Sequence, residues 1–336
     1  MRHLALVLLV LPAIAEEPKP YVHVPDTISK EAQEYLRKFT APPETLSLPT
    51  PDDVAGWKRA REGLEAWGLP ASEAAIQRYA PQIDERELGG VKVLDIKPKG
   101  WTPNRRVLVY AHGGAYTLFS ARSTLGNAIL AADTTGLRVI SVDYTVAPEA
   151  KWPQVTDQLV AVIQALKEEG HPLASIAVYG DSAGGGLAAA AALKMRDKGL
   201  GMPAALVLQS PWADVTDSGD SAVTLRDAEP FYTYAQLKPC ADAYADPKDQ
   251  KHPYVSPVYA DFSKGFPATL IQGGTKELFL SHFVRLYRAI DGAGGAATLD
   301  LYDGMPHVFQ VPLADAPEGK AAWKKMREFL ARNVAE

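Results

Sequence analysis

Short apolar runs alternate with amphipathic stretches along most of this chain, which has 336 residues. Runs rich in Val, Ile and Leu predict strands near 91–96, 106–111, 137–142, 175–179, 204–209, 268–272 and 296–302. The stretches between them predict helices near 121–135, 154–169, 183–198, 282–291 and 320–334. Continuous apolar strands that alternate with helices are typical of a mostly parallel sheet covered on both faces. We therefore expect residues 89–336 to form one α/β domain.

Two segments depart from this alternation. Residues 16–88 contain helical patterns at 28–39, 51–66 and 71–80, separated by proline-rich joints. Residues 212–265 are rich in aromatic side chains and proline, and they interrupt the alternation between two predicted strands. Loops of this length usually have a function. We expect both segments to form a helical cap over the functional site; the alternative is an elaboration packed away from it at the sheet edge.

The N-terminus has the pattern of a signal peptide. A short basic start, Met1-Arg2-His3, precedes the apolar run from Leu4 to Leu11 and the small residues that end at Ala15. This predicts cleavage near Ala15 and export to the periplasm or the medium. The apolar run is too short to span a bilayer, so we expect no stable membrane anchor. The single cysteine, Cys240, excludes an intrachain disulfide and is expected to be a buried small side chain.

Composition excludes several function classes. The chain has 35 Lys and Arg against 40 Asp and Glu, a formal net charge of −5, and its basic residues are interspersed with acidic ones. The sequence has no basic patch that would indicate a nucleic-acid partner. The sequence has no HExxH, CxxC or dinucleotide-binding fingerprint, so we expect neither a metal nor an organic cofactor. It carries no signal for the oligomeric state.

Ser182 is the strongest candidate for chemistry. It lies in Gly180-Asp181-Ser182-Ala183-Gly184, directly after a predicted strand and directly before an alanine-rich predicted helix. A G-x-S-x-G sequence between a strand and a helix indicates a nucleophile elbow, in which a sharp turn exposes the serine hydroxyl above the sheet. The glycines are needed because side chains there would collide with neighbouring backbone.

A serine hydroxyl needs a base and an acid that orients the base. In α/β hydrolases the partners follow in the chain order Ser, acid, His. His307 lies C-terminal to the serine, in a glycine-containing loop after the last predicted strand, and is the candidate base. Glu277, after the strand near 268–272, is the preferred acid, and Asp303 is the alternative.

The developing negative charge of an acyl-transfer reaction needs backbone N–H donors. A histidine–glycine loop, Ala111-His112-Gly113-Gly114-Ala115, follows the predicted strand at 106–111. This position suits the HGGG-type loop of esterases, and Ala183, after the nucleophile, would supply a further N–H. We expect His112 to organise the loop rather than to act as the base.

These motifs together resemble the bacterial hormone-sensitive-lipase-like (family IV) carboxylesterases of the α/β-hydrolase superfamily. The resemblance extends from about residue 91 to the C-terminus. Four stretches carry it: His112-Gly113-Gly114-Ala115, Asp143-Tyr144-Thr145-Val146-Ala147-Pro148-Glu149, Gly180-Asp181-Ser182-Ala183-Gly184-Gly185 and Gly304-Met305-Pro306-His307-Val308-Phe309.

The resemblance implies an α/β-hydrolase fold with a helical cap, and hydrolysis of small ester substrates with short or medium acyl chains. It implies a catalytic triad and an oxyanion hole formed by six residues: Ser182, Glu277, His307, Gly114, Ala115 and Ala183. The sequence departs from the family pattern in four ways. Ala115 replaces a glycine, and Tyr144-Thr145-Val146 stands where the family has tyrosine–arginine–leucine, in a segment expected to be structural. Glu277 stands where many relatives have Asp, and His282 stands where some have an aspartate, a change without an explanation at this level.

Several aromatic and apolar residues near these motifs are candidates for the substrate pocket, and plain core packing explains each equally well. They are Tyr116, Phe119, Trp212, Phe231, Tyr232, Val308 and Phe309. An amidase or a lactonase would use the same triad, because all of these reactions pass through a tetrahedral intermediate. A binding protein that has lost catalysis is the remaining alternative, and the presence of both His307 and Glu277 argues against it.

Overall fold

A computed structural model describes residues 19–43, 48–216 and 218–336 of the chain. The predicted signal peptide, residues 1–15, lies outside the described residues.

Within the described residues, eight strands form one sheet in the order β1-β2-β4-β3-β5-β6-β7-β8. All neighbours from β4 to β8 pair in parallel, whereas β1 with β2 and β2 with β4 pair antiparallel. The strands are β1 (Gln82–Leu88), β2 (Val91–Lys97), β3 (Val107–Ala111), β4 (Arg138–Val142), β5 (Ile176–Asp181), β6 (Ala205–Gln209), β7 (Ala268–Gly274) and β8 (Ala297–Tyr302). This confirms the predicted α/β-hydrolase fold with a mostly parallel sheet.

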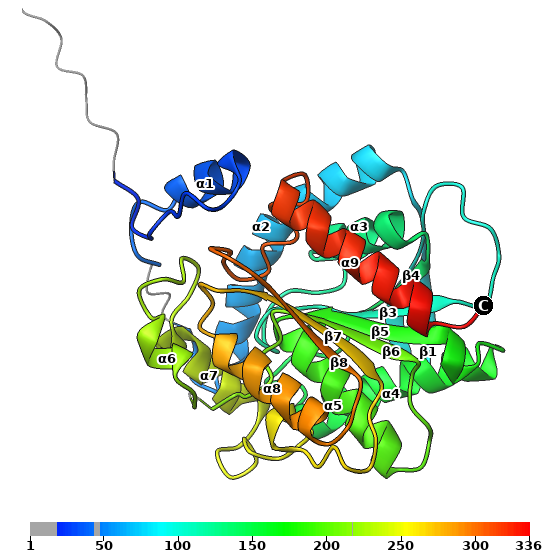
Figure 1. Cartoon of the computed structure of the whole chain (residues 1–336). Helices are drawn as coiled ribbons and strands as arrows, with labels where there is room; N and C mark the ends of the chain where they lie inside the picture. Colours follow the sequence, from blue (N-terminus) through cyan, green and yellow to red (C-terminus); the bar gives the residue numbers. More distant parts are fainter. Residues whose placement is uncertain (1–18, 44–47, 217) are drawn as a thin grey trace, which may run out of the picture.

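Helices cover both faces of this sheet (Figure 1). The helices are α1 (Lys30–Arg37), α2 (Val54–Tyr79), α3 (Leu125–Thr135), α4 (Trp152–Glu168), α5 (Ala183–Asp197), α6 (Ser221–Thr224), α7 (Tyr234–Tyr244), α8 (Leu280–Gly292) and α9 (Pro317–Asn333). Side chains alternate along β3: Val107 and Val109 join the core under α4, α5 and α8, and Leu108 and Tyr110 join the core under α3 and α9. The alternation follows from the two-residue repeat of a strand.

The first strand was not predicted. Residues 82–88 fall within the segment expected to be helical, but they form β1, an edge strand paired only with β2. Its sequence, Gln-Ile-Asp-Glu-Arg-Glu-Leu, is mostly polar and largely accessible to solvent. An edge strand of this kind lacks the apolar run that identifies a buried strand, so hydrophobicity alone does not reveal it.

The predicted helices at 51–66 and 71–80 are one helix. α2 continues through Pro70, which removes a single backbone hydrogen bond from the helix. Contacts on both sides of the proline hold the helix against the start of α3. Gly68 lies so close to Ser123 that an added Cβ would be 2.8 Å from the Ser123 carbonyl oxygen, and the Ser72 hydroxyl donates to the same oxygen at 2.9 Å.

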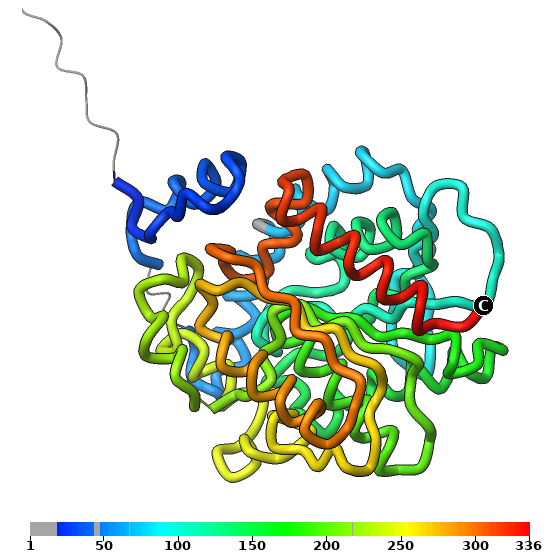
Figure 2. The backbone as a smooth tube through the Cα atoms, in the orientation of Figure 1, coloured from blue at the N-terminus to red at the C-terminus, as the bar shows by residue number. Residues whose placement is uncertain are grey.

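The two irregular segments, residues 16–88 and 212–265, meet beside the loop that follows β8. α1 contributes Ala32 and Leu36 to a small apolar cluster with Met305 and Phe309, and Phe39 packs edge-on against Phe231 of the insertion. Figure 2 shows α1 and much of the insertion at one end of the sheet, with the C-terminus at the other. The middle of the insertion, at Phe231 and Tyr232, contacts Phe39 and His307.

Among the described residues, no helix combines the length and the apolar character needed to cross a membrane. Cys240 is buried in the core on the α5 side of the sheet, as expected for a small side chain used for packing.

Candidate active site

Ser182 occupies a strained turn between β5 and α5. Its φ of 54° and ψ of −123° lie in a region that non-glycine residues rarely adopt. The flanking glycines are required by contact: a Cβ on Gly180 would lie 2.3 Å from the Gly184 carbonyl oxygen, and a Cβ on Gly184 would lie 2.0 Å from that of Ala111. The geometry is that of a nucleophile elbow.

The imidazole of His307 is paired with the carboxyl group of Glu277. His307 Nδ1 lies 2.7 Å from Glu277 Oε2, and Glu277 is completely buried. The other carboxyl oxygen, Oε1, accepts hydrogen bonds from the Gly274 N–H at 2.6 Å and the Ser210 hydroxyl at 2.8 Å. A carboxylate that accepts from Nδ1–H fixes the tautomer and leaves Nε2 free to accept a proton.

Ser210 is a site residue that the sequence reasoning missed. Its buried hydroxyl donates to Glu277 and accepts from the Val308 N–H at 3.0 Å. The residue before it, Gln209, accepts the Ser182 N–H at 2.9 Å. Ser210 therefore links the acid, the histidine loop and the strand end beside the nucleophile. Its place directly after a predicted strand is a sequence signal that could have identified it as a site residue.

Asp303, the alternative acid, is placed elsewhere. Its side chain is exposed and accepts a hydrogen bond from the hydroxyl of Thr27, near the start of α1. The imidazole nitrogen that an orienting acid must hold is already bonded to Glu277.

Burial sets the protonation of the pair. It lowers the pKa of His307 to about 4, although the nearby carboxyls of Glu229 and Asp181 act in the opposite direction. Burial also raises the pKa of Glu277, and the hydrogen bonds from Gly274 and Ser210 oppose this rise because they favour the carboxylate. At neutral pH the imidazole is therefore neutral, the form in which it acts as a base.

The histidine–glycine loop packs directly beside Ser182. An added Cβ on Gly113 would lie 3.2 Å from the Ser182 Cβ. Gly114 has a φ of 113° and Ala115 a φ of 51°, so the alanine at the third position adopts the left-handed conformation. Within the described part of the chain, the N–H groups of Gly114, Ala115 and Ala183 donate no hydrogen bond, as an oxyanion hole requires.

His112 organises this loop, as expected. It is completely buried, its ring stacks on Tyr144 at 4.1 Å, and its Nδ1 lies 2.7 Å from the Gly113 carbonyl oxygen. The Tyr144 hydroxyl donates to the His112 carbonyl oxygen at 2.7 Å. Tyr144 therefore supports the histidine–glycine loop.

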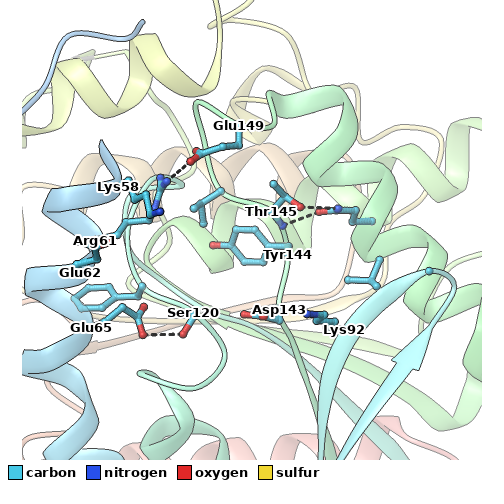
Figure 3. A pocket seen from close by; sticks show the side chains of 15 residues that line it. Lys58, Arg61, Glu62, Glu65, Lys92, Ser120, Asp143, Tyr144, Thr145 and Glu149 are labelled. Atoms are coloured by element: carbon cyan, nitrogen blue, oxygen red, sulfur yellow. Dashed lines mark hydrogen bonds and ion pairs between the residues drawn. The ribbon is translucent and has the colours of Figure 1, made fainter. Parts of the chain in front are cut away.

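Tyr144 also lines a surface cavity of about 600 Å³ (Figure 3). Its walls include α2 and the loop after β4, which are connected by an ion pair between Arg61 and Glu149. Glu65 of α2 accepts a hydrogen bond from Ser120. Neither the nucleophile nor its candidate partners line this cavity.

The pocket candidates lie in several different places. Tyr116 and Trp212 are buried and stack at 5.7 Å, and Tyr232 presents its ring edge-on to the His307 imidazole at 4.9 Å. The side chains of Phe309 and Phe231 instead pack against the α1 segment. Phe119 lies in the wall of the surface cavity that Tyr144 also lines. The Val308 N–H group donates a hydrogen bond to the Ser210 hydroxyl.

The structure explains His282. It is completely buried at the start of α8, stacks on Phe279 at 4.8 Å, and its Nε2 lies 2.9 Å from the Tyr234 hydroxyl oxygen. Burial lowers its pKa to about 4. A neutral His282 thus ties the first turn of α7 to α8. No cluster of His, Cys, Asp and Glu able to hold a metal occurs among the residues that the structure describes.

Comparisons with known proteins agree with this arrangement. A family profile described as alpha/beta hydrolase fold matches residues 108–311. An acetyl-hydrolase of Streptomyces hygroscopicus is 35% identical over 231 residues, which cover 69% of this chain and 77% of that protein.

Solved structures are also similar. A hormone-sensitive lipase from a metagenome library has a TM-score of 0.76 and 30% identity, with 84% of this chain and 95% of that chain covered. Esterase E25 has a TM-score of 0.86 and 26% identity, with 99% of both chains covered.

We expect Ser210→Ala to lower kcat for ester hydrolysis about tenfold, because a hydrogen bond to the Glu277 carboxylate contributes about 1.5–3 kcal/mol. Unfolding in urea should show a loss of about 1–3 kcal/mol, because the Val308 N–H loses its partner. Ser72→Ala is the matched control: Ser72 also donates one hydrogen bond and accepts one, far from the triad. It should lose stability and keep its kcat. A normal kcat in Ser210→Ala would contradict the role given to Ser210.

The two candidate acids can be separated directly. Glu277→Gln should lower kcat by about 10³ to 10⁴, because the amide no longer favours the Nδ1–H tautomer or a positive imidazole. Asp303→Asn should stay within about threefold of the wild type, as is usual for an exposed side chain away from the site. Steady-state hydrolysis of one activated ester measures both, and the reverse result would reassign the acid.

Proposed function

The chain belongs to the hormone-sensitive-lipase-like esterases of the α/β-hydrolase family, and we propose that it hydrolyses carboxylic esters of short to medium acyl chain through Ser182, His307 and Glu277. The observation that carries the proposal is the buried network of Glu277, Ser210 and His307 at the strand ends next to the Ser182 elbow.

In the first step, Ser182 Oγ attacks the ester carbonyl carbon while His307 Nε2 takes the hydroxyl proton. The imidazole becomes positively charged, and the Glu277 carboxylate stabilises that charge through Nδ1–H. The carbonyl oxygen becomes an oxyanion, which accepts hydrogen bonds from the N–H groups of Gly114, Ala115 and Ala183. Because these donors belong to the backbone of tightly packed turns, they need little rearrangement during the reaction.

The tetrahedral intermediate then collapses. The bond from carbon to the alcohol oxygen breaks, and His307 returns its proton to the leaving alcohol. Water attacks the acyl group on Ser182 in the second half of the reaction, with His307 again acting as base. The carboxylic acid leaves and the serine hydroxyl is restored.

The preference for short and medium acyl chains rests on the cap. Tyr232 lies on the catalytic imidazole, and Phe39 of the α1 segment lies on Phe231, so the two irregular segments cover the histidine side of the site. Tyr116, Trp212 and Tyr244 are fully buried, and the ring of Tyr116 stacks on each of the other two. Large rings fill space on this side of the site, so a short acyl group fits there more easily than a long one.

Purified protein should release p-nitrophenol from the acetate and butyrate esters faster than from the palmitate ester, and Ser182→Ala should reduce turnover by at least about 10³. The matched control is Ser281→Ala, a serine on α8 that bonds Ser221 of the insertion. Wild-type turnover no greater than that of Ser182→Ala would favour a binding protein, and preference for an anilide or a lactone over every ester would favour an amidase or a lactonase.

The N-terminal pattern supports export as a further part of the proposal. Cleavage after Ala15 would give a mature chain that begins at Glu16. The mass of the protein recovered from the periplasm or medium should correspond to residues 16–336. Recovery of an exported protein that retains Met1 would contradict cleavage at this place.

A further inference from the structure

A second buried carboxyl group lies beside the loop that carries His307, and the mechanism above does not use it. Glu229 belongs to the insertion, five residues after α6, and is completely buried. Its Oε1 accepts a hydrogen bond from the Phe231 N–H at 3.1 Å. Its Oε2 is also buried and has no hydrogen-bond partner within the described part of the chain.

Glu229 lies close to the base. The N–H group of His307 and the charge of its imidazole both favour the ionised form of Glu229 and so lower its pKa, and the nearby Glu277 raises it. Tyr232, three residues after Glu229, presents its ring edge-on to the same imidazole at 4.9 Å. The titratable groups that face Glu229 come from α1, the insertion, the turn after β7 and the loop after β8: Tyr35, Tyr232, Lys276, Glu277 and His307.

The two buried carboxyls differ in their hydrogen bonds. Glu277 accepts hydrogen bonds from Gly274, Ser210 and His307, two of which donate through side chains, whereas among the described residues Glu229 is approached only by the backbone N–H groups of Phe231 and His307. Two negative charges next to one neutral imidazole would be unfavourable in a buried site. The negative charge therefore belongs on Glu277, which has more donors, and the proton on Glu229. Burial raises the pKa of both carboxyl groups, that of Glu229 to about 8, so it is the number of hydrogen-bond donors that assigns the charge to Glu277.

We propose that Glu229 is a positioning residue for the base and acts through His307. When Glu229 loses its own proton, its negative charge increases the affinity of the imidazole for the proton taken from Ser182. The inference rests on the proposed function. Neutral Glu229 affects the imidazole little, but ionised Glu229 adds a second negative charge that stabilises the imidazolium of the transition state. The insertion would thus contribute to the chemistry as well as covering the site.

The sign of the effect on rate follows from this charge. The positive imidazole of the transition state favours ionised Glu229, so kcat/KM should rise with pH as Glu229 loses its proton. A favourable interaction of one pKa unit corresponds to a factor of about ten. In the wild type, kcat/KM should therefore rise about tenfold between about pH 7 and pH 9.

Three variants test this rise with p-nitrophenyl butyrate. Glu229→Gln retains an acceptor for Phe231 but cannot ionise, so its kcat/KM should stay flat over the same range, with little change in KM. Glu229→Asp retains a carboxyl group and should restore part of the rise. Asp227→Asn is the matched control, because Asp227 belongs to the same segment and its side chain is 74% exposed. It should behave as the wild type. An alkaline rise that persists in Glu229→Gln would overturn the proposal.

Thermal unfolding tests the proton on Glu229 without any turnover. A carboxyl whose pKa is raised in the folded state stabilises the fold fully below its ordinary value of 4.5, and this contribution is lost as the pH rises towards 8. Glu229→Gln has no ionisable group at this position, so its stability does not fall for this reason. The Tm of this variant should therefore exceed that of the wild type by a margin that widens by about 5 °C between pH 5 and pH 8. Asp227→Asn should show no such change.

The two measurements separate this inference from the proposed function. If the difference in Tm between Glu229→Gln and the wild type stays constant with pH while turnover is intact, the role of Glu229 is refuted and the proposed function is not. Wild-type turnover no greater than that of Ser182→Ala would refute the proposed function, and with it the effect on rate, even if the margin in Tm widens as expected.

Discussion

Parallel pairing of four adjacent strands is the constraint on which the site depends. β5, β6, β7 and β8 run in the same direction, so their carboxyl ends reach one edge of the sheet together. The elbow follows β5, Ser210 follows β6, and Glu277 and His307 lie in the turns after β7 and β8. Residues 125 positions apart in the chain are thereby brought to one place, with Ser182 at one end of that interval and His307 at the other. Strand order rather than local sequence creates the site.

Buried hydrogen bonds then fix the groups at this edge. The Ser210 hydroxyl lies between the acid and the histidine loop, and Tyr144 supports the histidine–glycine loop in the same way. A buried polar network is costly when one of its members is unsatisfied, so each of these bonds restricts its neighbours to one arrangement. The same reasoning makes Glu229 informative, because a buried carboxyl group with one oxygen that has no hydrogen-bond partner among the described residues retains its proton.

Much of the fold was readable from the chain. The apolar runs identified seven of the eight strands that the described residues form, because a strand buried on both faces must be apolar throughout. β1 was missed because an exposed edge strand does not need that pattern. α2 was divided at Pro70 because propensity favours a break there, whereas packing of Gly68 and Ser72 against Ser123 holds the helix together. Tertiary contacts overrode local preference in both places.

The sequence by itself determined the fold class, the nucleophile elbow and the glycine loop, because each depends on residues that are neighbours in the chain. A strand, a turn that only glycine permits and a helix must follow one another in order. Only the tertiary structure decided that Glu277 rather than Asp303 holds His307, that Ser210 connects them, and that Glu229 of the insertion lies beside the base. These facts depend on distances between segments remote in sequence, and strand order and burial set such distances.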